Sequence, residues 1–216
     1  IIDSLGEIQP RRWPGTSPCS HGRPAGATRH AHEQLFVVGI VERLDAGSSG
    51  LLVVARTQHA ADALIEQFAS HAATRVYFAL VWGHPEAPHG VIDAPIGRSR
   101  QDPLKMAVVA DGRPSRTEYR VLERFDRPAE LAFLECRLET GRTHQSRVHL
   151  SSINHPLVGD PVYGQRRPKL QVERPFLHAA ELAFVHPATG ERVTFHSELP
   201  ADLAGRLATL HRVVED

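Results

Sequence analysis

The stretch VERLDAGSSGLLVVARTQ, from Val41 to Gln58, places one carboxylate, Asp45, in a Gly/Ser loop directly ahead of an apolar run. That run, LLVVA (51–55), and the earlier QLFVVGI (34–40) are short apolar segments bounded by residues that break regular structure. Such segments are typical of strands buried on both faces of a sheet. We therefore expect two buried strands joined by a loop that carries Asp45.

Asp45 has two interpretations from this local sequence. Asp beside Gly and Ser most often forms a turn, in which its side chain accepts backbone N–H bonds. A loop between two buried strands can also hold a carboxylate rigidly at the edge of a sheet, where it acts as a nucleophile or base. The loop by itself favours the turn, and the two roles are compatible.

The residues that follow predict a helix and then a strand. Thr57 can cap a helix that ends near Ser70, because apolar residues recur at helical spacing between them. RVYFALVWG (75–83) predicts a strand whose alternate side chains point to opposite faces, so Tyr77 can face a different environment from the main core. The two faces would carry Val76, Phe78 and Leu80, and Tyr77, Ala79 and Val81.

Further strands are expected along the rest of the chain. KMAVVADGRPSRTEYRVLERF (105–125) predicts a hairpin around the Asp111–Gly112 turn, and ELAFLECRLET (130–140) predicts another strand. FLHAAELAFVHPATGERVTFHS (176–197) predicts a strand pair around its PATG turn. This strand-heavy pattern with hairpin connections indicates an α+β fold, with a mixed, mainly antiparallel sheet and flanking helices.

Two more helices complete the expected pattern. One is capped by Thr143 and runs to about Ile153, with Arg147 in its first turns. The other lies in ADLAGRLATLHRVV (201–214), where Leu203, Leu207 and Leu210 share one face: this is the spacing of an amphipathic helix.

Length and composition indicate one main domain. We expect an irregular arm over residues 1–34, which are rich in Pro, Arg and Gly, and a catalytic domain over 35–216. Formal net charge is zero, with 25 basic and 25 acidic residues, so bulk charge alone does not predict a nucleic-acid binder. Two cysteines, Cys19 and Cys136, give no disulfide framework, and no apolar run approaches the ~20 residues of a membrane span. The opening residues show no secretion signal, so we expect a cytoplasmic protein.

The densest polar stretch, TGRTHQSRVHLSSINHPLVGDPVYG, spans residues 140–164. It includes Arg142, His144, Gln145, Arg147, His149 and His155. A helix N-terminus attracts anions, and nearby Arg strengthens that attraction for phosphate or carboxylate. A metal site built from the three histidines is the alternative. His144 and His149 lie about 140° apart round a helix, unlike the i, i+4 pair of a zinc-binding helix.

Four segments, RLDAGSSGLLVVART, TRVYFALVWG, LETGRTHQSRVHLSSINHPLVGDPVYG and FLHAAELAFVHP, follow one another along the chain. In this order and spacing they closely resemble the RluA-type RNA pseudouridine synthase family, from about Gly39 to the C-terminus. The resemblance implies a pseudouridine synthase fold with a catalytic cleft across the sheet. It also implies isomerisation of uridines in RNA, without cofactor or metal.

The resemblance implies a role for four matching residues. The aspartate of the family's R-L-D motif is the catalytic nucleophile and matches Asp45. The tyrosine of Y-x-A-L-V-x-G stacks on the flipped base and is a candidate base for removing a sugar proton; it matches Tyr77. The arginine of H-Q-x-R-V-H pairs with the catalytic carboxylate and matches Arg147. A leucine of the L-H-A strand packs around the target base and matches Leu177.

Further contacts and two departures complete these expectations. We expect Arg43, Arg142, His144 and Gln145 to bind substrate. Glu42 stands where the family usually has His, and adds an unfavourable charge unless Arg43 or another Arg neutralises it. Ser146 stands where Ile is usual and removes apolar packing beside Arg147.

The leading hypothesis is a monomeric, cofactor-independent enzyme that acts on ribosomal rather than transfer RNA. A module that keeps this fold and binds RNA without turnover is the first alternative. A metal-dependent hydrolase that uses the histidines is the second.

Overall fold

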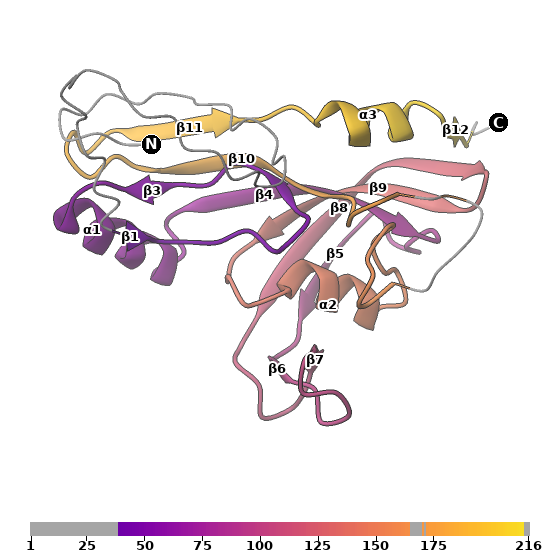
Figure 1. Cartoon of the computed structure of the whole chain (residues 1–216), viewed down its shortest axis with the longest axis horizontal. Helices are drawn as coiled ribbons and strands as arrows, with labels where there is room; N and C mark the ends of the chain where they lie inside the picture. Colours follow the sequence, from indigo (N-terminus) through magenta and orange to yellow (C-terminus); the bar gives the residue numbers. More distant parts are fainter. Residues whose placement is uncertain (1–38, 165–169, 171, 214–216) are drawn as a thin grey trace, which may run out of the picture.

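A central eight-stranded sheet organises the molecule in this computed structural model, which describes residues 39–164, 170 and 172–213. Its main path runs β11-β10-β4-β9-β8-β12, while β2 pairs with β10 and β5 pairs with β8 (Figure 1). The strands are β2 Ser49–Gly50, β4 Thr74–Trp82, β5 His89–Asp93, β8 Arg116–Arg127, β9 Leu131–Leu138, β10 Leu177–Val185, β11 Arg192–His196 and β12 His211–Arg212. All pairs are antiparallel except β2 with β10, so the expected mixed, mainly antiparallel sheet is confirmed.

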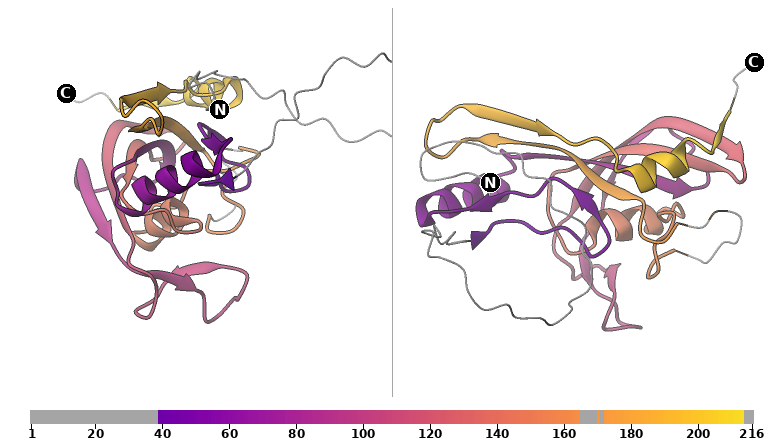
Figure 2. Two further views of the ribbon diagram at one scale, coloured as in Figure 1. Left: turned by 90° about the vertical axis from the view of Figure 1, so that its left-hand side faces the viewer. Right: turned by 45° about the horizontal axis from the view of Figure 1, so that its top comes forward.

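Among the described residues, three helices and two small ribbons lie around this sheet. The helices are α1 Gln58–Ala69, α2 Gln145–Ser152 and α3 Ala201–Leu207. The ribbons are β1 Gly39–Ile40 with β3 Val54–Ala55, and β6 Ile96–Arg98 with β7 Met106–Val108. The β6–β7 hairpin projects away from the sheet beside α2, as Figures 1 and 2 show. No described helix has the length and apolar character needed to cross a membrane.

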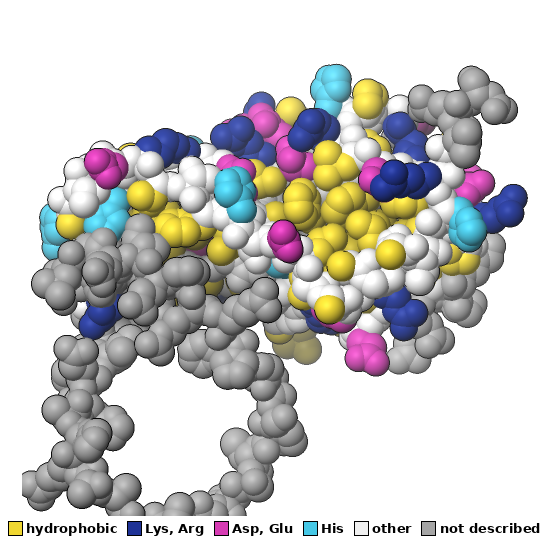
Figure 3. Space-filling model, turned by 90° about the horizontal axis from the view of Figure 1, so that it is seen from above, with side chains coloured by type: hydrophobic (Ala, Val, Ile, Leu, Met, Phe, Trp, Pro, Cys, Tyr) yellow, Lys and Arg dark blue, Asp and Glu magenta, His cyan; other side chains and the backbone are white. Residues whose placement is uncertain are grey.

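Side chains of β4 alternate between two layers, as their spacing predicts. Tyr77, Ala79 and Val81 pack with β9 residues and Leu150 of α2. Leu80 and Trp82 point to the opposite layer, where Leu203 of α3 packs. That second layer includes half-buried residues, and Figure 3 shows hydrophobic side chains gathered at the surface on the α3 side. The pocket described below opens on the first layer.

Helix α1 begins and ends where its capping residues predict. The Thr57 side chain accepts a hydrogen bond from the Ala60 N–H at 3.2 Å, and Ser70 forms the C-cap. Its buried residues Ala61 and Leu64 pack against Phe184 of β10. Capping and helical periodicity therefore fix this element locally.

The prediction of a hairpin over residues 105–125 is wrong. Strand β7 pairs with β6, whereas β8 pairs with β5, β9 and β12. A turn forms one position earlier than expected, at residues 110 and 111, where the Gly112 N–H donates to the Val109 carbonyl at 2.9 Å. The chain then turns back onto Ile96, where a Cβ at Gly112 would lie only 2.6 Å from the Ile96 backbone. Strands β5 and β9 thus occupy the two edges of β8, one of which the local pattern assigned to β7.

Other boundaries differ from expectation. Helix α2 is capped by His144, in a left-handed conformation with φ 59°, and not by Thr143. In the 51–55 run only Val54–Ala55 forms a strand, and α3 ends at Leu207, so buried Leu210 follows it. The 1–34 arm, Cys19 and most of the 34–40 segment lie outside the described residues.

Candidate active site

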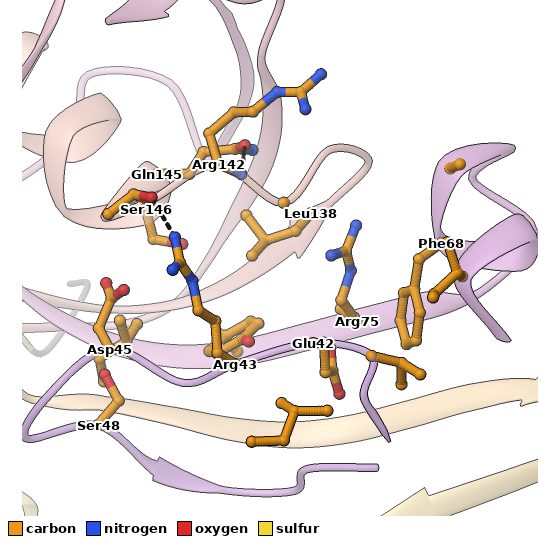
Figure 4. Close-up of a pocket in the computed structure, with 18 residues that line it drawn as sticks. Glu42, Arg43, Asp45, Ser48, Phe68, Arg75, Leu138, Arg142, Gln145 and Ser146 are labelled. Carbon is orange, nitrogen blue, oxygen red and sulfur yellow. Dashed lines mark hydrogen bonds between the residues drawn. The ribbon is translucent and has the colours of Figure 1, made fainter. Parts of the chain in front are cut away.

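A pocket of about 390 Å³ lies beside β4, at the start of α2 and below the 40–48 loop. Asp45, Tyr77, Leu138 and Leu177 contribute to its lining, so residues from four separate segments meet there. Figure 4 shows Asp45 and Ser48 at one end, with Arg75 and Phe68 toward the other. The pocket is open enough for a planar base and contains both apolar and charged side chains.

Asp45 forms a turn and also faces Arg147. The turn is closed through its main chain, whose carbonyl accepts from the Ser48 N–H at 3.0 Å. Its carboxylate Oδ2 lies 3.9 Å from Nη1 of Arg147. The Asp45 side chain is 21% exposed and that of Arg147 only 4%, so the pair joins an accessible carboxylate to a buried cation. The turn expected at Asp45 therefore forms, but through its main chain, and its side chain faces Arg147.

Arg147 is held from behind by Asp160, which the sequence reasoning missed. Its Nε and Nη2 donate to the two Asp160 carboxylate oxygens at 2.8 and 2.9 Å, a bidentate pair with no exposure at Asp160. Burial raises the pKa of Asp160, but Arg147 and the Val162 and Tyr163 N–H groups lower it further, leaving it below its usual value. Asp160 is thus a fixed anion that orients Arg147 toward Asp45. Its only signal in the sequence is its place in the GDPVYG segment.

Tyr77 offers an aromatic surface to the pocket. It is 9% exposed on β4, between Cys136 of β9 and Ala179 of β10. Burial and the nearby charge of Glu42 raise the pKa of its hydroxyl, which keeps the phenol neutral at physiological pH. A neutral phenol is a weak base, so the geometry suits stacking better than proton removal.

Glu42 meets Arg75 in the same pocket. Burial raises the pKa of Glu42 to about 7, although Arg75 and the Val53 N–H act to lower it. Arg75 is 7% exposed and lies over the Phe68 ring at 5.2 Å. Its Nε has no hydrogen-bond partner within the part of the chain that the structure describes. Arg75 is therefore the arginine whose charge favours the ionised form of Glu42. The sequence left this role open between Arg43 and another Arg.

Of the other predicted substrate contacts, all but His144 line the pocket. Arg43, Arg142 and Gln145 line the pocket with Leu177, and Arg43 donates to the Thr143 hydroxyl. The side-chain amide of Gln145 makes its hydrogen bonds within the protein. Its partners are Thr140, Thr117 and main-chain groups of residues 116 and 142. Gln145 thus shapes the turn before α2.

The histidines of this region do not converge on one point. His144 Nδ1 lies 2.8 Å from the Tyr163 hydroxyl, while His149 contacts Thr117 and the Ala94 carbonyl. His155 contacts the Trp82 carbonyl. Burial lowers the pKa of both His144 and His149. Over residues 39–164 and 172–213, no group of three His, Cys, Asp or Glu side chains could hold a metal ion.

Comparisons with known proteins identify the family of this chain. A family model described as RNA pseudouridylate synthase matches residues 17–152. An uncharacterized RNA pseudouridine synthase of Chloroflexus aurantiacus is 53% identical over 76% of this chain and 51% of its own length. The ribosomal large subunit pseudouridine synthase D of Zymomonas mobilis is 48% identical over 76% of this chain and 54% of its own. The chain thus spans about half the length of these relatives.

A solved structure extends the likeness to three dimensions. The human RNA pseudouridylate synthase domain containing 1 superposes with a TM-score of 0.69 and 30% identity, over 80% of this chain and 73% of that one. From the family model, the relatives and the shared fold, we conclude that this chain belongs to the RNA pseudouridylate synthase family.

Proposed function

We propose that this protein isomerises specific uridines in RNA to pseudouridine, with Asp45 as the nucleophile. The observation that carries the proposal is the Asp45 carboxylate, 3.9 Å from buried Arg147, in a pocket also lined by Tyr77. A cation beside a carboxylate orients it through a charge-assisted contact. This is the arrangement that a carboxylate nucleophile requires.

The reaction needs no net change in atoms or electrons. The bond from uracil N1 to the sugar breaks, the base turns within the pocket, and a bond forms from the sugar to C5. A proton leaves C5 and N1 gains one. Asp45 attacks either the sugar or the uracil and is released again before the product leaves, while the pocket walls shield the free base from water as it turns.

Tyr77 and Leu177 support the proposed binding of a flipped base. A base must leave its helix before its sugar bond can be reached, and an aromatic face replaces the stacking that it loses. Tyr77 lies on the pocket wall with its phenol neutral, and Leu177 packs in the same apolar layer. We assign Tyr77 to stacking in preference to proton removal, because its phenol stays neutral.

The proposed substrate is ribosomal RNA of the large subunit. Two of the relatives, from Zymomonas mobilis and Nitrosomonas europaea, are named ribosomal large subunit pseudouridine synthase D. We further propose that the protein acts as a monomer in the cytoplasm. Exposed Arg43 and pocket-lining Arg142 would meet RNA phosphates at the pocket mouth.

Incubating the chain with ribosomal and transfer RNA transcripts, followed by mass spectrometry of the digested nucleosides, tests the activity. We expect pseudouridine in ribosomal RNA, and none with Asp45→Asn or Asp45→Ala. Asp62→Asn is the matched control, because Asp62 is exposed on α1 and away from the pocket. Product formation by Asp45→Ala would remove Asp45 as nucleophile. Salt-dependent RNA binding without product would favour a binding module instead.

A further inference from the structure

Tyr163 connects three parts of the molecule through its side chain. Its hydroxyl accepts the Met106 N–H of the β6–β7 hairpin at 3.0 Å and lies 2.8 Å from His144 Nδ1. Its ring lies beneath the guanidinium of Arg147, whose Cζ is 5.1 Å from the ring centre. Tyr163 therefore touches the projecting hairpin, the start of α2 and the cation that faces Asp45.

The main chain of Tyr163 strengthens the same arrangement. Its N–H donates to Asp160 Oδ1 at 3.0 Å, and Asp160 holds Arg147 by the bidentate pair. The Arg147 guanidinium is thus fixed at its edge by Asp160 and at its face by Tyr163. Only its Nη1 is directed to Asp45.

His144 adds strain that the Tyr163 hydroxyl helps to maintain. At φ 59° and ψ 23°, His144 has a left-handed backbone conformation that residues other than glycine rarely adopt. No side-chain cap holds the start of α2, but the His144 ring packs edge-on to Tyr163, with ring centres 5.6 Å apart. Arg147 follows in the first turn of that helix, so the position of His144 affects the position of Arg147.

We propose that Tyr163 is a positioning residue for the isomerisation, joining the β6–β7 hairpin to the Arg147–Asp45 pair. The inference deepens the proposed function and rests on it. Tyr163 does not line the pocket, and it touches Arg147, which in turn faces Asp45. It acts through Arg147, so its removal changes the rate of the chemical step more than the affinity for RNA.

The test uses Tyr163→Phe, which keeps the ring under Arg147 and removes only the hydroxyl. Tyr119→Phe is the matched control, because Tyr119 is a half-buried tyrosine on β8 away from Arg147. At saturating ribosomal RNA, we expect the single-turnover rate of Tyr163→Phe to fall about tenfold, the size of one lost hydrogen bond. We expect its RNA dissociation constant to stay within about twofold of the parent value.

A spectroscopic measurement tests the positioning without activity. The Arg147 Nε–H, bonded to Asp160, gives an NMR signal that we expect to shift or broaden in Tyr163→Phe and to stay in place in Tyr119→Phe. The Met106 amide should also exchange faster with solvent in Tyr163→Phe.

An unchanged rate and an unchanged Arg147 signal would overturn the proposal, and so would a loss confined to RNA affinity. If the parent protein forms no pseudouridine in any RNA, the proposed function fails. The NMR and exchange results then decide the positioning role on their own.

Discussion

Glu42 makes the stability of this protein depend on pH. Its pKa is about 7 in the folded protein, against an ordinary value of 4.5, because burial disfavours its charge more than Arg75 and the Val53 N–H stabilise it. Between these two values the folded protein binds a proton that the unfolded chain has released. Stability therefore falls as pH rises from about 4.5 to 7, and the penalty stays constant above pH 7.

The size of this effect follows from the pKa difference. A shift of one unit corresponds to about 1.4 kcal/mol, so a change from 4.5 to about 7 sets an upper limit of about 3.5 kcal/mol. The pocket is open to solvent, which reduces the cost of the charge, and about 1 to 3 kcal/mol is the expected range. Glu42→Gln keeps the size of the side chain and removes the titration. The variant should be more stable than the parent by this amount at pH 8 and nearly equal to it below pH 4.5.

Urea unfolding followed by circular dichroism at several pH values between 4.5 and 8 measures the difference. Titrations elsewhere occur in both proteins and cancel in the comparison. Glu66→Gln is the control, because Glu66 is exposed on α1 and its replacement should give no pH-dependent difference. A stability difference that does not change over this pH range would refute the buried, proton-binding state of Glu42.

Three further substitutions test the contacts that hold the pocket. Asp160→Asn takes the charge from the buried pair with Arg147, and should cost about 3 kcal/mol in urea unfolding and abolish pseudouridine formation; full activity would contradict the orienting role. Gly141→Ala would place a Cβ 2.3 Å from Arg75 Nη1, and the overpacking should cost about 1 to 3 kcal/mol; an unchanged melting temperature would show that Arg75 moves freely. Thr57→Ala removes the cap of α1 and should cost about 1 kcal/mol in thermal unfolding, without loss of activity.

Local patterns determined much of the fold. The cap and spacing of α1, the two faces of β4 and the β10–β11 pair follow from hydrogen bonding and periodicity within short segments. These features depend on neighbouring residues along the chain, so the sequence contains all the information needed to predict them. The resemblance to a family likewise selected Asp45, Tyr77 and Arg147, and the structure brings all three into one region.

Only the tertiary structure decided which distant residues hold that site. Asp160 and Tyr163 are 13 and 16 positions after Arg147, in a loop whose sequence indicates only turns. Arg75 acts on the charge of Glu42 because β4 passes beneath the loop that carries Glu42, and β7 pairs with β6 because β5 and β9 occupy the edges of β8. A carboxylate, a guanidinium or a strand edge binds whatever partner the fold places within reach. The identity of that partner depends on the fold of the whole chain and cannot be predicted from the spacing of a few residues.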